Sequence, residues 1–246
     1  MKGKQVWVSS LAAVAFVMVA SLQAQQPPAQ GGAQDQVAAL KQSMQQGLAG
    51  IRQYEWVETT IISLKGEEKA RKQNRCYYGA DGKVQKVSLD QAPAPEQAPS
   101  GRGGRRGARV KEKVVENKKD ELKEYMEQAA TLIHAYVPPD PAKIQAAKDA
   151  GRVAANPQAA GKVRLVISQY LKPGDSLTLD VDGAANRLTG LGVNTYLDKP
   201  EDAVTLAVQM NALADGALYA AQTTLEAKAK NITVVIQNSG HRPVQR

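Results

Sequence analysis

From residue 54 to residue 237, most of the chain consists of stretches in which apolar and polar residues alternate, separated by short turn sequences. Successive side chains of a β-strand point to opposite faces, so this alternation predicts strands with one apolar and one polar face. The turns are marked by Asp81-Gly82, Pro173-Gly174, Asp182-Gly183, Lys199-Pro200 and Asp215-Gly216. The predicted strands are residues 54–65, 69–78, 84–89, 163–171, 176–182, 188–197, 204–210, 218–229 and 232–237.

Three segments have the spacing of helices instead. Residues 35–51 and 110–136 are amphipathic, because their apolar residues recur every three or four positions. Pro138 and Pro139 stop the second helix, and Asp140-Pro141 starts a short third one that Gly151 can end. The apolar faces of the two amphipathic helices consist of Val37, Leu40, Met44, Leu48 and Ile51, and of Val115, Leu122, Met126, Ala129, Ile133 and Tyr136.

These elements predict an α+β fold. No helix separates one strand from the next after residue 163, so the sheet is expected to be antiparallel. A sheet with one apolar face needs a cover, and the two amphipathic helices are the candidates. We therefore expect a curved antiparallel sheet, an incomplete β-barrel, with helices covering its concave face.

The first 24 residues have the pattern of a bacterial secretory signal peptide. Lys2 and Lys4 precede an uncharged apolar run, and cleavage is expected after Ala24. A membrane anchor is the alternative, but the run of about 15 residues is shorter than the roughly 20 that span a bilayer. The mature protein is expected in the periplasm or secreted, and not as an integral membrane protein.

The rest of the chain is expected to form one half-barrel-like domain. A flexible leader covers residues 25–34, the domain covers residues 35–238, and a polar tail covers residues 239–246. Residues 91–109 are rich in Pro, Gly and Arg and contain no large apolar residue, so they are expected to form a disordered surface loop.

The formal net charge of the chain is +8 at pH 7, and four arginines of the disordered loop concentrate part of it. An exported protein meets anionic lipid rather than nucleic acid, and no aromatic residue is interleaved for base stacking. We expect either contact with anionic head groups or an inert solubilising loop, and no nucleic-acid partner. The four residues are Arg102, Arg105, Arg106 and Arg109.

The second half of the chain resembles the periplasmic lipoprotein-carrier half-barrels. The resemblance is carried by Leu177-Thr-Leu-Asp-Val-Asp-Gly183, Arg187-Leu188, Lys199-Pro200 and Leu213-Ala-Asp-Gly-Ala-Leu-Tyr219, and the strand Tyr54-Glu-Trp-Val-Glu-Thr-Thr60 is similar to the first sheet segment of that family. The resemblance implies an incomplete barrel whose concave face holds acyl chains under a helical lid. None of these motifs is catalytic.

The sequence contains no recognisable catalytic or cofactor motif, so no enzyme, cofactor or metal is expected. Cys76 is the only cysteine and is expected to be a small buried residue on a strand. His134 is expected to pack at the edge of the long helix, and His241 to be solvated in the tail. Asp180 and Asp182 share a strand face, which indicates a solvated surface or, as the alternative, a weak calcium site.

Three functions remain open. The first is a carrier that binds a lipid or the acyl group of a protein. The second is a module that binds another envelope protein and has a filled core, and the third is a hydrolase whose site is assembled by the fold. For the carrier, the predicted apolar wall consists of Trp56, Ile62, Leu64, Leu177, Leu179, Val181, Leu206, Val208 and Met210, which are equally candidates for the core.

Overall fold

The computed structural model describes residues 46–47, 49–90 and 105–244, with the side chains of residues 105–119 and 141 left out. The predicted signal peptide, the leader and the first part of the predicted N-terminal helix lie outside the described residues. Residues 46–50, apart from residue 48, are helical and lead into the short 3₁₀-helix η2 (Ile51–Gln53).

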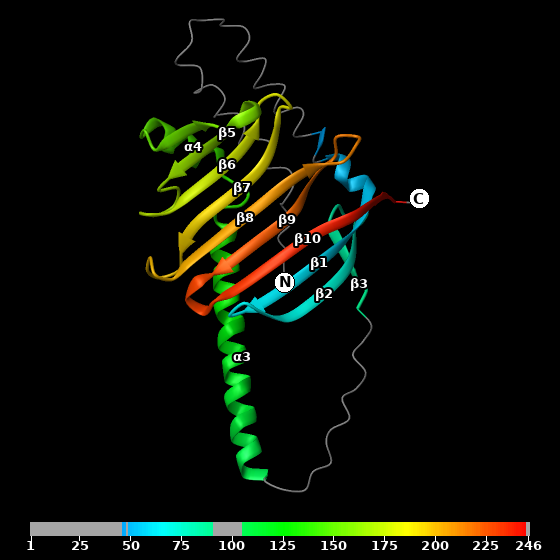
Figure 1. Ribbon diagram of the computed structural model, residues 1–246, viewed down its shortest axis with the longest axis vertical. Coiled ribbons are helices and arrows are strands. Elements are labelled where there is room, and N and C mark those ends of the chain that lie inside the picture. Colours follow the sequence, from blue (N-terminus) through cyan, green and yellow to red (C-terminus); the bar gives the residue numbers. More distant parts are fainter. Residues whose placement is uncertain (1–45, 48, 91–104, 245–246) are drawn as a thin grey trace, which may run out of the picture.

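Ten strands form one antiparallel sheet in the order β3-β2-β1-β10-β9-β8-β7-β6-β5-β4 (Figure 1). The two groups of strands predicted on either side of the long helix are joined where β1 pairs with β10, with Ile62 opposite Val234. The sheet is open, with β3 and β4 at its edges. The strands are β1 (Tyr54–Leu64), β2 (Glu67–Tyr78), β3 (Val84–Ser88), β4 (Val153–Pro157), β5 (Lys162–Ser168), β6 (Ser176–Asp182), β7 (Arg187–Tyr196), β8 (Ala203–Ala212), β9 (Leu218–Ala227) and β10 (Ile232–Pro243).

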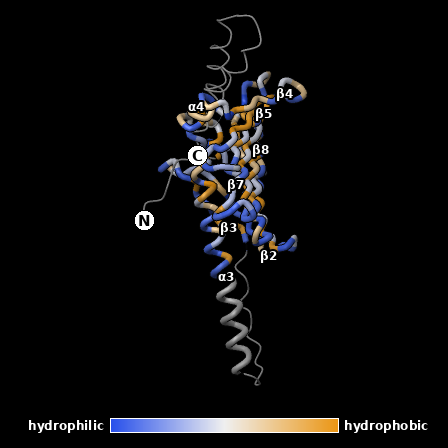
Figure 2. The backbone as a smooth tube through the Cα atoms, turned by 90° about the vertical axis from the view of Figure 1, so that its left-hand side faces the viewer, coloured by the Kyte–Doolittle hydropathy of each residue, from blue (hydrophilic) through white to orange (hydrophobic). Residues whose placement is uncertain are grey.

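Two helices, α3 (Arg105–His134) and α4 (Pro141–Asp149), connect β3 to β4. Figure 2 shows α4 and the C-terminal part of α3 on the same side of the sheet, which is its concave face. The predicted α+β fold class, a curved antiparallel sheet covered by helices, is confirmed. The start of α4 is also as predicted, because the Asp140 side chain accepts a hydrogen bond from the backbone N–H of Ala142 at 2.9 Å.

Two predicted boundaries are wrong, and one strand was not predicted. The long helix begins at Arg105, so residues 105–109 are not part of a loop, and the arginines and alanine among these residues are good helix formers. Strand β4 was not predicted, because its five residues show little alternation. The predicted tail is wrong as well, since β10 continues to Pro243 and its last residues pair with the start of β1.

The hydrophobic core lies between the helices and strands β5 to β8. Leu177, Leu179 and Val181 of the predicted wall belong to this core and are at most 8% exposed. They are packed against residues of α3, α4 and the segment between these helices, so this part of the concave face is filled. The helical side of the core consists of Ala129, Ile133, Tyr136, Val137, Ile144 and Ala147.

A buried carboxylate fixes the end of α3 to the sheet. Asp175, 3% exposed, accepts hydrogen bonds from the backbone N–H groups of Tyr170, Leu171 and Lys172 and from the Tyr136 hydroxyl at 2.5 Å. The Tyr136 hydroxyl also lies 2.7 Å from Thr195 Oγ1 on β7. Burial and the bond to Asp175 raise the pKa of Tyr136, so its phenol stays protonated and donates. A buried carboxylate is stable only when it is satisfied in this way.

We predict that Tyr136→Phe lowers the free energy of unfolding by about 1.5–3 kcal/mol, because it leaves the buried Asp175 carboxylate without its hydroxyl donor. Tyr196→Phe is the matched control. The Tyr196 hydroxyl donates to the Pro173 carbonyl at 2.9 Å in an exposed position, so its loss is expected to cost less than about 0.5 kcal/mol. Urea unfolding of both variants measures the difference, and equal losses would contradict the anchoring role of Asp175.

Candidate functional site

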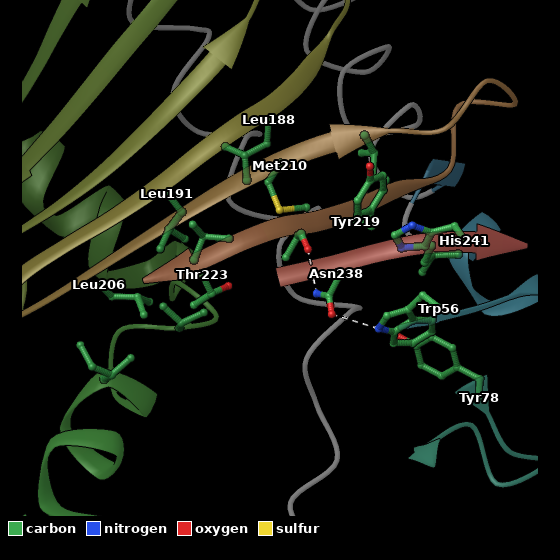
Figure 3. Close-up of a pocket in the computed structure, with 16 residues that line it drawn as sticks. Trp56, Tyr78, Leu188, Leu191, Leu206, Met210, Tyr219, Thr223, Asn238 and His241 are labelled. Atoms are coloured by element: carbon green, nitrogen blue, oxygen red, sulfur yellow. Dashed lines mark hydrogen bonds between the residues drawn. The ribbon is translucent and has the colours of Figure 1, made fainter. Parts of the chain in front are cut away.

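A cavity of about 230 Å³ lies on the concave face beside the filled core (Figure 3). It is lined by strands β2, β1, β10, β9, β8 and β7, by the end of α3 and by Ile51 of η2. In a flat sheet β2 and β7 would be about 24 Å apart, at ~4.8 Å per strand. The curvature of the sheet turns these strands toward one common space. None of the described residues that line it is Lys, Arg, Asp or Glu.

One end of the cavity is aliphatic. Its walls come from the end of α3 and the residues just after it, from β7 and from β8. Figure 3 shows Leu191 and Leu206 on the side of the helix. Leu188 and Leu191 of β7 both face the cavity although they are three residues apart, because a bulge at Thr189 leaves that residue unpaired. The aliphatic residues are Ile133, Val137, Leu188, Leu191, Leu206, Val208 and Met210.

The other end of the cavity is formed by four rings on four adjacent strands, which we call the ring row. Tyr78 of β2 lies 5.8 Å from Trp56 of β1, Trp56 lies 6.1 Å from His241 of β10, and His241 lies 4.0 Å from Tyr219 of β9, measured between ring centres. Asn238 orients the indole, because its Oδ1 accepts the Trp56 Nε1–H bond at 3.1 Å. Its Nδ2 donates to the Ala220 carbonyl at 2.8 Å, so the amide is held on both sides (Figure 3).

His241 reaches the ring row through a bulge in β10. Trp56 stands opposite two residues of β10, Gly240 and His241, and Gly240 has φ +63°. A glycine in this left-handed conformation is the usual first residue of such a bulge. The expectation that His241 is solvated in a tail is therefore wrong. Burial lowers the pKa of His241, so the imidazole is neutral at pH 7.

The N-terminal helical segment closes the cavity near the β8–β9 turn. A Cβ on Gly47 would lie 2.5 Å from Leu218 Cγ, and one on Gly50 would lie 3.0 Å from Ala217 Cβ. The two glycines thus allow the segment to lie directly against this hairpin. The contact places Ile51 in the cavity wall.

The structure brings together four of the nine predicted wall residues, namely Trp56, Leu206, Val208 and Met210. The three from β6 lie in the filled core, and Ile62 and Leu64 lie half-buried on β1, outside the cavity lining. Sequence reasoning did not identify the ring row as a unit, because the bulge in β10 that brings His241 to the concave face was not recognised. The one available signal was Gly240, a glycine inside the strand. Gly190 marks the bulge in β7 in the same way, and that bulge adds Leu188 to the aliphatic end.

The four predicted anion-contacting arginines are not placed at a site. Arg102 lies outside the described residues, and Arg105, Arg106 and Arg109 belong to the first turns of α3, where the described structure includes no side chains.

The remaining candidate groups have structural roles. Cys76 is a fully buried free thiol as predicted, and burial raises its pKa to about 11. Asp180 accepts hydrogen bonds from Arg164 at 2.7 and 2.9 Å, and Asp182 caps a turn at the Ala185 N–H. Among the described residues, no group of three His, Cys, Asp or Glu side chains is arranged to hold a metal ion. No helix within these residues is both long and apolar enough to cross a membrane.

No protein-family model and no curated protein sequence matches the chain. Among solved structures it is similar to a DUF1329 family protein from Desulfovibrio piger, with 12% identity, a TM-score of 0.38, and coverage of 85% of this chain and 90% of that chain. It is also similar to a LolA superfamily protein from Nitrosomonas europaea, with 7% identity, a TM-score of 0.33, and coverage of 78% and 86%.

The lowered pKa of His241 predicts a pH dependence of stability. As the pH falls through about 6.5, the unfolded chain takes up a proton at this residue that the folded chain resists. The free energy of unfolding is therefore expected to fall between pH 7.5 and pH 5, and to fall less in His241→Gln. Urea unfolding of both proteins at the two pH values measures this. A drop of the same size in the variant would contradict the burial of a neutral imidazole.

Proposed function

We propose that this protein binds an apolar ligand, a lipid or the acyl group of a lipoprotein, in the cavity of its half-barrel and does not change it chemically. The observation that carries this proposal is an apolar cavity on the concave face beside the filled core, with no Lys, Arg, Asp or Glu among the described residues that line it. Binding sites for small apolar molecules are mostly concave and apolar with few polar groups. A cavity of this kind favours a ligand carrier over a protein-binding module, whose core was expected to be filled.

The size of the cavity sets the strength of binding. A dry cavity of about 150 Å³ holds benzene, so by proportion this cavity holds roughly nine carbon atoms. At about 0.8 kcal/mol for each buried methylene, nine carbons contribute about 7 kcal/mol before the cost of association. Such an energy corresponds at best to a dissociation constant of about 10 μM. This affinity suits a carrier that must also release its ligand.

The chemistry of the lining supports binding without catalysis. The imidazole of His241 is flanked by the rings of Trp56 and Tyr219 rather than by a serine or cysteine. Cys76 does not line the cavity, and its raised pKa keeps it in the thiol form. In the described chain, the cavity lining thus lacks a nucleophile paired with a base, which acyl transfer requires.

The N-terminal sequence supports a setting outside the cytoplasm. Its basic start, apolar run and small residue before the expected cleavage point favour export into the periplasm or beyond. In that compartment the ligand would come from a membrane lipid or an acylated envelope protein.

Filling the cavity tests whether it is the binding site. We expect Met210→Trp to weaken uptake of a neutral apolar dye, 1-N-phenylnaphthylamine, at least about tenfold, since this equals the loss of about two buried methylenes. Gln209→Trp adds the same side chain at the neighbouring, exposed position of β8 and is expected to bind as the natural protein does. Fluorescence titration measures both. Unchanged uptake in Met210→Trp would place the dye elsewhere.

A series of straight-chain alcohols tests the size of the site. The affinity, measured by displacement of the dye, is expected to rise about fourfold for each added methylene and to level off near nine or ten carbons, where the cavity is full. A rise that continues unchanged to sixteen carbons would contradict the size of the cavity as the limit. No binding of any alcohol would contradict the proposed function itself.

A further inference from the structure

The two ends of the cavity differ in chemistry, which gives a bound amphiphile a direction. Figure 3 shows Leu188, Leu191 and Leu206 gathered at one end, and the ring row at the other. The hydrocarbon tail of an amphiphile is stabilised most at the aliphatic end, because it leaves water there and contacts only other hydrocarbon groups. The ring row carries dipoles on the imidazole and the phenols, and the Asn238 amide beside it adds another. Burying a polar head group therefore costs less free energy at this end.

An arginine stands beside the ring row. The Arg52 guanidinium lies over the ring of Tyr78, with its Cζ 6.0 Å from the ring centre. Arg52 is exposed and directly follows Ile51, which lines the cavity. It therefore lies at the end of the cavity that the rings form, and it is not part of the lining.

Arg52 forms no salt bridge within the described chain. Glu58 and Lys86 are charged side chains on this part of the concave face, and the Lys86 ammonium donates to both carboxylate oxygens of Glu58 at 2.6 and 2.7 Å. Lys86 is opposite Cys76, which is opposite Trp56, and Glu58 shares the face of Trp56 because it is two residues further along β1. Near the same end, the Asp215 carboxylate accepts a hydrogen bond from the Tyr54 hydroxyl at 2.7 Å.

We propose that the ligand is a single-chain amphiphile with an anionic head group, a fatty acid or a compound of the same shape, whose carboxylate binds Arg52 while its tail fills the aliphatic end. This inference rests on the proposed function and names its ligand class. A cavity for roughly nine carbons admits one chain and not several. A guanidinium suits the head group, because it presents paired N–H donors to a carboxylate.

A cationic head group fits the site less well than an anionic one. Aromatic rings alone attract cations, but Arg52 already lies over Tyr78 and would repel a quaternary ammonium. Partial burial lowers the pKa of His241 below its ordinary value, which favours the uncharged imidazole at neutral pH. An uncharged head group would leave the affinity independent of Arg52.

The test compares dodecanoate with dodecanol on the full chain and on Arg52→Gln, by displacement of the neutral dye. We expect Arg52→Gln to weaken dodecanoate binding about three- to tenfold and to leave dodecanol within twofold. Added salt is expected to weaken the binding of dodecanoate and not that of dodecanol. The dodecanol result also shows that the variant is folded and that its cavity is intact.

Arg75→Gln is the matched control. Arg75 also lies over a tyrosine, with its Cζ 5.9 Å from the Tyr77 ring centre, and Tyr77 is on the opposite face of β2 from Tyr78. The control removes the same charge from the face of the sheet opposite the cavity, where Arg75 lies 3.7 Å from the Glu55 carboxylate, so dodecanoate binding is expected to stay unchanged. If both variants lose the same affinity for dodecanoate, the effect comes from the net charge of the protein, and the assignment of Arg52 is overturned. Equal binding of acid and alcohol to all three proteins would overturn the ligand class but not the proposed function, whereas no binding of either would overturn both.

Discussion

Trp56 and Asn238 are 182 residues apart in the chain, and the pairing of β1 with β10 brings their side chains to 3.1 Å. This ladder joins the N-terminal meander β1–β3 to the seven strands that follow the helices. Without it, the meander would be a separate three-stranded sheet with no cover for its apolar face. The cavity depends on the same ladder, because two rings of the ring row come from the meander and two from β9 and β10.

The sequence predicts well which side chains share a face of this sheet, but it does not predict which part of the apolar face is covered by helices. Alternation in β6 correctly identifies Leu177, Leu179 and Val181 as concave-face residues, and the same alternation in β8 identifies Leu206 and Met210. The first group is covered by α4 and the end of α3, whereas the second lies partly beyond them. Whether an apolar face is filled or open depends on where distant helices dock, and a local pattern carries no information about that.

Two bulges explain most of what the sequence did not reveal about the site. A one-residue insertion reverses the face of every later side chain in a strand. In β10 the insertion at Gly240 turns His241 into the cavity, although simple alternation from Asn238 would place it on the convex face. In β7 the insertion next to Gly190 adds Leu188 to the same wall as Leu191. A glycine within a strand marks where such a reversal can occur, but not whether it does.

The anchoring of α3 determines which part of the cavity wall is rigid. Ile133 of α3 and Val137, just after the helix, form this wall on either side of Tyr136. The hydroxyl of Tyr136 bonds to Asp175 and Thr195, which ties this stretch to the turn before β6 and to β7. Moving that wall would leave a buried carboxylate unsatisfied, which costs more than the few methylene contacts a ligand offers there. The aliphatic end is therefore a preformed surface, and a ligand must fit it rather than reshape it. If the protein binds an amphiphile as proposed, selection among ligands falls to chain length at this fixed end and to the head group at the ring row.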